Sequence, residues 1–187
     1  MRRLERDHLF EAPAGFDEPL EMLLGCHRRI EKQLETLKRL RTHLDGHAVD
    51  AEATLAAQNV LRYFTSAASN HHADEEQDLF PLLESRIDDA GEKARFAAFR
   101  ERLEDDHRRL EAAWSRLKRP LEGIAEGLPR TLPAVDVEAF VAAYASHILT
   151  EETTLKDFFD RWLGDDDRRA LGHSMAARRK VTPIRPS

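Results

Sequence analysis

The sequence predicts an all-α protein: an up-down-up-down four-helix bundle followed by a short C-terminal helix. Four long stretches carry apolar residues three or four positions apart, which places those residues on one face of a helix. Short connections between the first three stretches favour antiparallel neighbours. The 187 residues suffice for one domain with a substantial core. We expect an N-terminal arm (residues 1–16), the bundle (17–163), and a short helix with a tail (164–187).

The first two helices are predicted from their start signals. Asp17, with Pro19 soon after it, suits the start of the first helix, and Gly46 marks the break that follows. Asp50 suits the start of the second helix. Pro81 falls in the last turns of the second helix and is expected to kink or end it, because proline lacks a backbone N–H.

The third helix follows a turn at residues 88–91. Its apolar stripe runs from Phe96 to Leu117, and Pro120 is expected to stop it. Glycines and prolines then predict a longer connection over residues 123–133.

The fourth stripe runs from Val137 to Trp162, and Gly164 closes this helix. The aspartates at 165–167 suit the start of a short final helix, because acidic side chains are favoured at the positive N-terminal end of a helix. Residues 178–187 are expected to form a frayed tail.

Each bundle helix carries one histidine within its apolar stripe. Two of these histidines are followed four residues later by a glutamate, and positions i and i+4 lie on one helix face. Carboxylates buried there need a partner, and a divalent cation supplies one. Imidazole and carboxylate donors without a thiolate suit iron, manganese or zinc. The sequence therefore predicts a metal site formed by His27, His71, Glu75, His107, His147 and Glu151.

The metal motifs occur twice in the chain. HRRIE and HRRLE lie 80 residues apart, and HHADEE and HILTEE lie 76 residues apart. We interpret the two halves as degenerate copies of one helical hairpin. A pseudo-two-fold axis between them would bring the four histidines and two glutamates to one level.

Several neighbouring residues are not predicted as ligands. His72 is rotated by one residue from His71 and is expected to face a neighbouring helix or solvent. Glu31 and Glu111 follow His27 and His107 at i+4, and we interpret them as solvated glutamates, with a ligand or hydrogen-bonding role as the alternative. The remaining histidines lie at the end of the first helix or in terminal segments: His8, His43, His47 and His173.

Two further side chains lie close to the predicted ligands in the sequence. Cys26 points about 100° away from His27 and is interpreted as a small buried hydrophobe, with a redox or ligand role as the alternative. Tyr144 lies almost one turn before His147, where it either reaches the site or only packs in the core.

These motifs resemble the hemerythrin-like, or HHE cation-binding, family over roughly residues 17–163. The most specific part is H-x-x-x-E-E-x-x-L-F-P at residues 71–81, supported by H-x-x-x-E-E at 147–152 and by H-R-R-hydrophobic motifs on the other two helices. The resemblance implies that the six residues bind two iron ions bridged by Glu75 and Glu151. Manganese or zinc are less favoured occupants.

The sequence departs from two named members of this superfamily. Oxygen-carrying hemerythrins have a histidine where this chain has Glu111, and their last bridging acid is an aspartate five residues beyond its histidine rather than Glu151 at four. Iron-sulfur repair proteins match the four-histidine, two-glutamate pattern better. They usually carry an N-terminal cysteine-containing segment, and no cysteine precedes Cys26 here.

The resemblance implies a non-haem diiron protein that binds or reacts with a small molecule such as oxygen, nitric oxide or peroxide. Sensing and enzymatic turnover both fit, and iron storage or iron-sulfur cluster repair is the alternative. A net charge of −6 without a basic stripe argues against nucleic acid as a partner. No apolar stretch is long enough to span a bilayer, and the opening MRRLERDH lacks the apolar core of a signal peptide, so we expect a cytoplasmic protein. The sequence does not indicate the oligomeric state.

Overall fold

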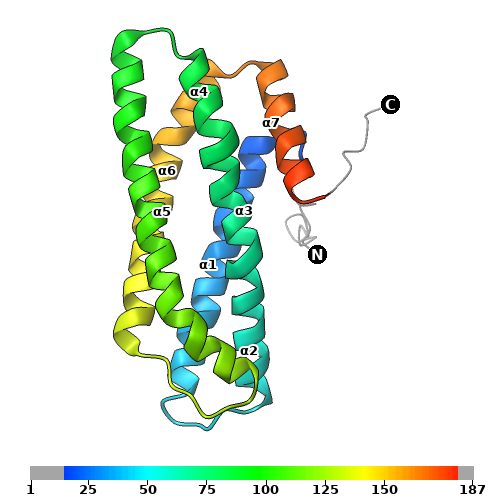
Figure 1. The fold of residues 1–187 in the computed structure, drawn as a ribbon, viewed down its shortest axis with the longest axis vertical. Coiled ribbons are helices and arrows are strands. Elements are labelled where there is room, and N and C mark those ends of the chain that lie inside the picture. Colours follow the sequence, from blue (N-terminus) through cyan, green and yellow to red (C-terminus); the bar gives the residue numbers. More distant parts are fainter. Residues whose placement is uncertain (1–14, 181–187) are drawn as a thin grey trace, which may run out of the picture.

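The computed structural model describes residues 15–180, and every regular element in that range is a helix (Figure 1). Consecutive bundle helices are neighbours: α1 (Pro19–His43) and α5 (Ala90–Ala125) each pack against both α2 (Ala51–Arg62) and α6 (Ala134–Trp162). The predicted all-α bundle with a short C-terminal helix is confirmed. The elements are α1 (Pro19–His43), α2 (Ala51–Arg62), η1 (Tyr63–Ala67), α3 (Ala68–Ala73), η2 (Asp74–Leu79), α4 (Phe80–Arg86), α5 (Ala90–Ala125), α6 (Ala134–Trp162) and α7 (Asp165–Arg178).

Two aspartates begin bundle helices by capping them. The Asp50 side chain accepts a hydrogen bond from the backbone N–H of Ala53 at 2.8 Å, which starts α2 at the predicted place. Asp89 accepts one from the N–H of Glu92 at 2.8 Å and starts α5. Each cap satisfies a backbone donor that the first helical turn leaves unpaired.

The second bundle helix runs from α2 to α4 and contains two π-helical turns, η1 and η2. In η2 the N–H of Phe80 bonds the carbonyl of Glu75, five residues earlier. Core positions four residues apart drift about 40° off one face of an α-helix with each step, and a wider π turn restores the face. Pro81 follows η2 directly, in the first turn of α4, where its missing N–H is tolerated. The helix continues past Pro81 to Arg86, so the prediction that Pro81 could end it is wrong.

Pro120 does not stop the third bundle helix, contrary to the prediction, because α5 continues to Ala125. A proline inside a helix costs about 3 kcal/mol. Leu121 and Ile124 beyond it are fully buried, and burial of each such side chain contributes about 1.5–3 kcal/mol. The packing of this last turn therefore outweighs the proline, and the connection to α6 is shorter than expected, at residues 126–133.

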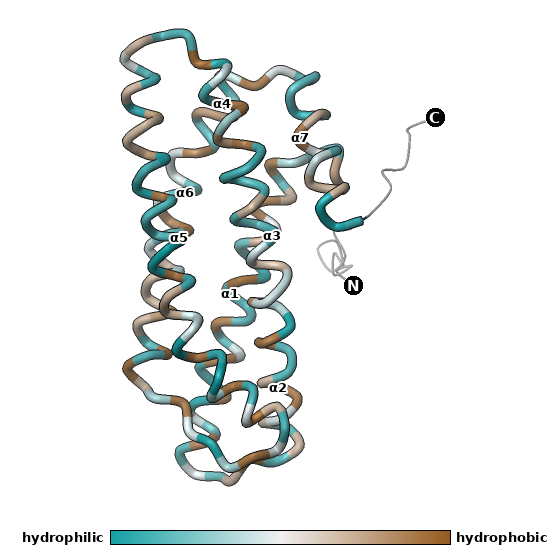
Figure 2. Tube along the Cα trace, viewed as in Figure 1, coloured by the Kyte–Doolittle hydropathy of each residue, from teal (hydrophilic) through white to brown (hydrophobic). Residues whose placement is uncertain are grey.

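A polar layer divides the apolar core into two clusters. On α1, His27 lies between Leu23 of one cluster and Ile30 of the other. On α5, His107 lies between Leu103 of one cluster and Leu110 of the other. Figure 2 shows apolar segments recurring along every bundle helix. Both clusters are well packed, so the helices are held firmly on either side of the layer.

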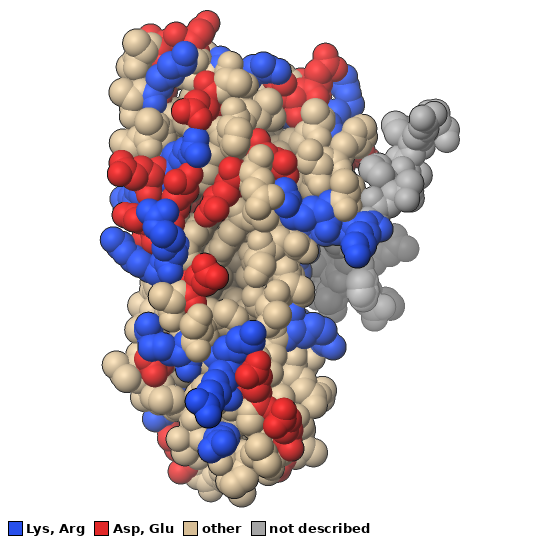
Figure 3. All heavy atoms as spheres, viewed as in Figure 1, with Lys and Arg blue, Asp and Glu red and all other residues tan. Residues whose placement is uncertain are grey.

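The surface gives no single-sign charge field on the face shown in Figure 3, where basic and acidic side chains are interspersed. Among residues 15–180, no helix combines the length and the apolar character needed to cross a membrane. The predicted N-terminal arm lies outside the described residues except for residues 15 and 16.

The final helix, α7, packs against α1 and η2. A side chain at Gly172 would collide with the backbone oxygen of Phe16, which explains the glycine at this close approach. Arg178 and Arg179 are not part of a frayed tail, contrary to the prediction, because both donate hydrogen bonds to the fully buried carboxylate of Asp74. Burial without cationic partners would be costly for this carboxylate, so the ion pairs fix the end of α7. The expected tail beyond residue 180 lies outside the described residues.

The Asp74 ion pairs predict a measurable contribution to stability. Arg179→Ala should lower the free energy of unfolding by about 1–3 kcal/mol, because it leaves a buried carboxylate with a single arginine partner. Arg169→Ala on the same helix is the control, because Arg169 forms an exposed pair with Asp166. Its effect should stay within about 0.5 kcal/mol. Equal unfolding midpoints in urea for the two variants would contradict this role.

Candidate metal centre

The structure brings all six predicted residues together in the polar layer. α1, α3, α5 and α6 each contribute one histidine, η2 contributes Glu75 and α6 contributes Glu151. His107 is the most exposed of the six, at 5%. The layer therefore combines six buried donor side chains from all four bundle helices.

Each of the two glutamates lies between imidazoles of different helices. Oε1 of Glu75 is 3.3 Å from Nε2 of His71, and its Oε2 is 3.3 Å from Nε2 of His107. Oε2 of Glu151 is 3.1 Å from Nε2 of His27 and 3.4 Å from Nε2 of His147. Both carboxylates thus span the two halves of the layer, an arrangement that suits bridging between two cations.

The possible ligand atoms fall into two groups, within each of which all atoms lie within 4.8 Å of one another. One group is His27, His71, Glu75 and Glu151, and the other is His72, His107 and His147. His72 is the one member of these groups that the sequence did not predict as a ligand. It faces the neighbouring helix α5, as the sequence allowed, and that direction brings it to His107.

Unsatisfied polar atoms converge in this layer. Among the described residues, the buried nitrogen and oxygen atoms without a hydrogen-bond partner include both oxygens of Glu75, Nε2 of His107 and both ring nitrogens of His147. Leaving such atoms unpaired costs about 1–3 kcal/mol each. A set of imidazole nitrogens and carboxylate oxygens with no thiolate fits iron, manganese or zinc, and a bound cation would satisfy these atoms.

A second glutamate in each H-x-x-x-E-E motif orients a histidine on the neighbouring helix. Nδ1 of His107 donates to Glu76 at 2.6 Å, and Nδ1 of His27 donates to Glu152 at 2.9 Å. A proton held on Nδ1 leaves Nε2 as the atom that faces the layer. Glu76 and Glu152 were not predicted as part of the site, although their place directly after Glu75 and Glu151 in both repeats is a usable signal.

The buried carboxylates and imidazoles of the layer shift one another's pKa values. Burial, together with the charge of Glu151, raises the pKa of Glu75 well above its usual value. Burial alone would lower the pKa of His27, but hydrogen bonds and charge from Glu151, Glu75 and Glu152 raise it to about 9. Burial lowers the pKa of His147 to about 4 and keeps the ring neutral. Neutral imidazole is the form that binds metal.

The structure bears on the roles of four residues near the predicted ligands: Glu31, Glu111, Cys26 and Tyr144. Glu31 and Glu111 are exposed, which agrees with their interpretation as solvated glutamates. Cys26 is buried, accepts a hydrogen bond from Arg29 at 3.0 Å, and burial raises the pKa of its thiol, as for a small core residue. Tyr144 is also buried, and its ring centroid lies 6.3 Å from that of His147.

A cavity of about 380 Å³ adjoins the layer between the second bundle helix and α5. Its lining includes His72, His107 and Tyr144, together with Glu76 and Glu111. The volume is ample for a diatomic molecule or peroxide, so the polar layer is accessible from this side.

Comparison with known proteins agrees with the site. The family model described as the hemerythrin HHE cation binding domain matches residues 18–159, and the chain belongs to this family. The chain is also similar to an uncharacterized protein of Haemophilus influenzae, 30% identical over 175 residues that cover 90% of this chain and 94% of the relative. The resemblance stated from the sequence motifs is confirmed. The protein is thus a hemerythrin-like cation-binding domain with a buried layer of histidine and glutamate donors.

The raised pKa of His27 predicts proton release on metal binding. Because the pKa of His27 is raised to about 9, His27 holds a proton at pH 7 that a bound cation must displace, so binding should release about one proton per chain. Metal affinity should rise with pH up to about 9, where His27 loses its proton unaided. Titration calorimetry in buffers of different ionisation enthalpy counts the protons. A heat of binding that does not depend on the buffer at pH 7 would contradict the assignment.

The orienting glutamates predict a second effect on metal affinity. Glu152→Ala and Glu76→Ala should each weaken metal binding roughly 10–100-fold, because outer partners fix the orientation of ligating histidines. Glu31→Ala on α1 is the matched control, since Glu31 is exposed and lies one turn after His27. Competition with a coloured chelator measures the affinities. If all three variants bind like the parent protein, the hydrogen bonds to Nδ1 do not support the site.

Proposed function

We propose that this domain holds two iron ions and binds or reacts with a small molecule such as oxygen, nitric oxide or peroxide. The metal ligands in this proposal include the six residues predicted from the sequence. The observation that carries the proposal is the position of Glu75 and Glu151, each between imidazoles of two different helices. Such carboxylates can hold two cations side by side with two histidines for each.

Iron is the occupant that fits the proposed reactivity. When bound, it supplies a change of oxidation state and open coordination positions for a small ligand. The chain itself supplies a pocket next to the layer and excludes most water from it. The cavity wall is formed by aromatic and aliphatic side chains such as Phe64, Ala68 and Trp114 together with the polar groups near His72.

The layer should bind two metal ions per chain. Anaerobic titration with Fe²⁺ should reach a plateau at about two equivalents, because two bridging carboxylates and four imidazoles divide between two ions. Glu75→Gln should lose tight binding of at least one ion, because the amide cannot carry the negative charge that two cations share. Glu101→Gln, at an exposed position on α5 outside the cavity lining, is the control and should keep both. A plateau at one ion in the parent protein would exclude a dinuclear centre.

The iron-loaded protein should respond to small molecules. Nitric oxide added without oxygen to the Fe²⁺ protein should change its optical and electron paramagnetic resonance spectra, and the zinc-loaded protein is the silent control. Consumption of many equivalents of peroxide would indicate an enzyme, and a stoichiometric change would indicate a binding or sensing protein. Rapid transfer of iron to a chelator with no response to oxygen, nitric oxide or peroxide would favour iron handling and contradict the proposal.

A further inference from the structure

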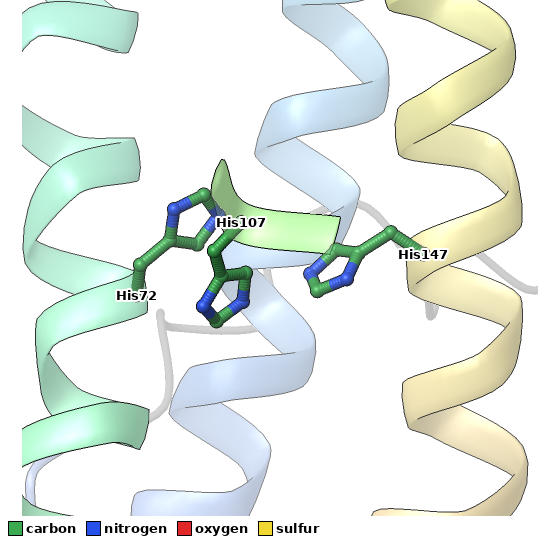
Figure 4. Close-up of side chains that lie close together, drawn as sticks. All are labelled: His72, His107 and His147. Carbon is green, nitrogen blue, oxygen red and sulfur yellow. The ribbon is translucent and has the colours of Figure 1, made fainter. Parts of the chain in front are cut away.

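We propose that His72 is a fifth imidazole ligand, which joins His107 and His147 around one of the two metal positions. The inference rests on the dinuclear site proposed above and names one more of its ligands. Figure 4 shows the three rings projecting from three different helices toward the space between them. One nitrogen of each ring lies within 4.8 Å of a nitrogen of the other two.

The contacts of His72 leave its nitrogen free for a cation. The His72 ring stacks on that of His107 with centroids 4.0 Å apart and an interplanar angle of 12°, and its centroid is 5.8 Å from that of His147. Nε2 of His72 is buried and has no hydrogen-bond partner among the described residues. Stacking alone would leave this nitrogen unsatisfied, at a cost of about 1–3 kcal/mol.

A small rotation would turn the stacked ring into a ligand. Two imidazoles that bind one cation both point a nitrogen at it, so the stack must open slightly on binding. The torsion that turns a histidine ring is broad and permits such a movement at little cost. His72 lines the cavity of about 380 Å³, which leaves room for its ring to move.

The internal repeat makes His72 the point where the two halves differ. HHADEE and HILTEE align His71 with His147 and Glu75 with Glu151, so His72 aligns with Ile148. Ile148 is buried in an apolar cluster and has no donor atom. One metal position would therefore have three imidazoles and the other two, so the two cations should bind with unequal affinity.

The test compares a variant that keeps the stacking with one that perturbs a similar pair elsewhere. His72→Phe retains an aromatic ring against His107 and removes the nitrogen. His47→Phe is the matched control, because His47 stacks on His43 at 4.5 Å outside the metal layer. Anaerobic Fe²⁺ binding in competition with a chelator gives the two affinities, and the visible absorption of the Co²⁺-loaded protein reports the donor set.

We expect His72→Phe to bind one ion as the parent does and the other at least about tenfold more weakly, since loss of even an outer partner of a ligand costs that much. The Co²⁺ spectrum should change for that ion alone, and His47→Phe should match the parent. If His72→Phe binds both ions as tightly as the parent protein does and its Co²⁺ spectrum is unchanged, the inference is wrong and the dinuclear site is unaffected. A parent plateau below two ions would contradict the dinuclear site and the inference together.

A second variant guards against misfolding. If circular dichroism shows that His72→Phe does not fold, His72→Ile replaces it, because isoleucine occupies the equivalent buried position in the other half of the bundle. The same loss of one affinity is expected, and two parent-like affinities in this variant would overturn the inference.

Discussion

The structure depends on two carboxylates buried at the centre of an apolar bundle. Glu75 and Glu151 are almost completely inaccessible, and isolated charges in such a place would be too costly to keep. Without a cation, burial raises the pKa of Glu75, and the neighbouring carboxylates raise the pKa of His27 to about 9. Two cations would compensate the carboxylate charges, and they would also satisfy the unpaired nitrogens of the surrounding histidines. The rest of the fold holds these groups together against their mutual repulsion.

The bundle achieves this through a repeated motif and through packing. Each H-x-x-x-E-E motif supplies a histidine and a carboxylate to the layer, and its last glutamate orients a histidine of the neighbouring helix. The two apolar clusters pack the helices together on either side of the layer. The ion pairs from α7 to Asp74 hold the start of η2, where Glu75 follows directly. The cavity beside α5 gives a small molecule a way to the layer. These features would suit small-ligand chemistry at the proposed metal pair.

The fold and the six residues of the layer could be predicted because polar residues at apolar stripe positions stand out in one helix at a time. His72 could not be ranked in this way. The helical period gives the direction of the His72 side chain relative to the axis of its own helix. Only the packing of the bundle places α5 on that side. The Asp74 pairs join residues more than 100 positions apart, beyond any local pattern. The prediction that Pro120 ends the third helix is wrong because the burial of Leu121 and Ile124 outweighs the local cost of the proline, and that burial cannot be seen in the sequence.

We propose that two metal ions lie between the four helices and share Glu75 and Glu151. The most direct measurement is a crystal structure of protein purified without added metal and then loaded anaerobically with Fe²⁺, with anomalous diffraction recorded on both sides of the iron absorption edge. A dinuclear iron site should give two anomalous peaks that vanish below the edge, each next to an oxygen of both glutamates. A single peak, or peaks that do not contact Glu75 and Glu151, would contradict it.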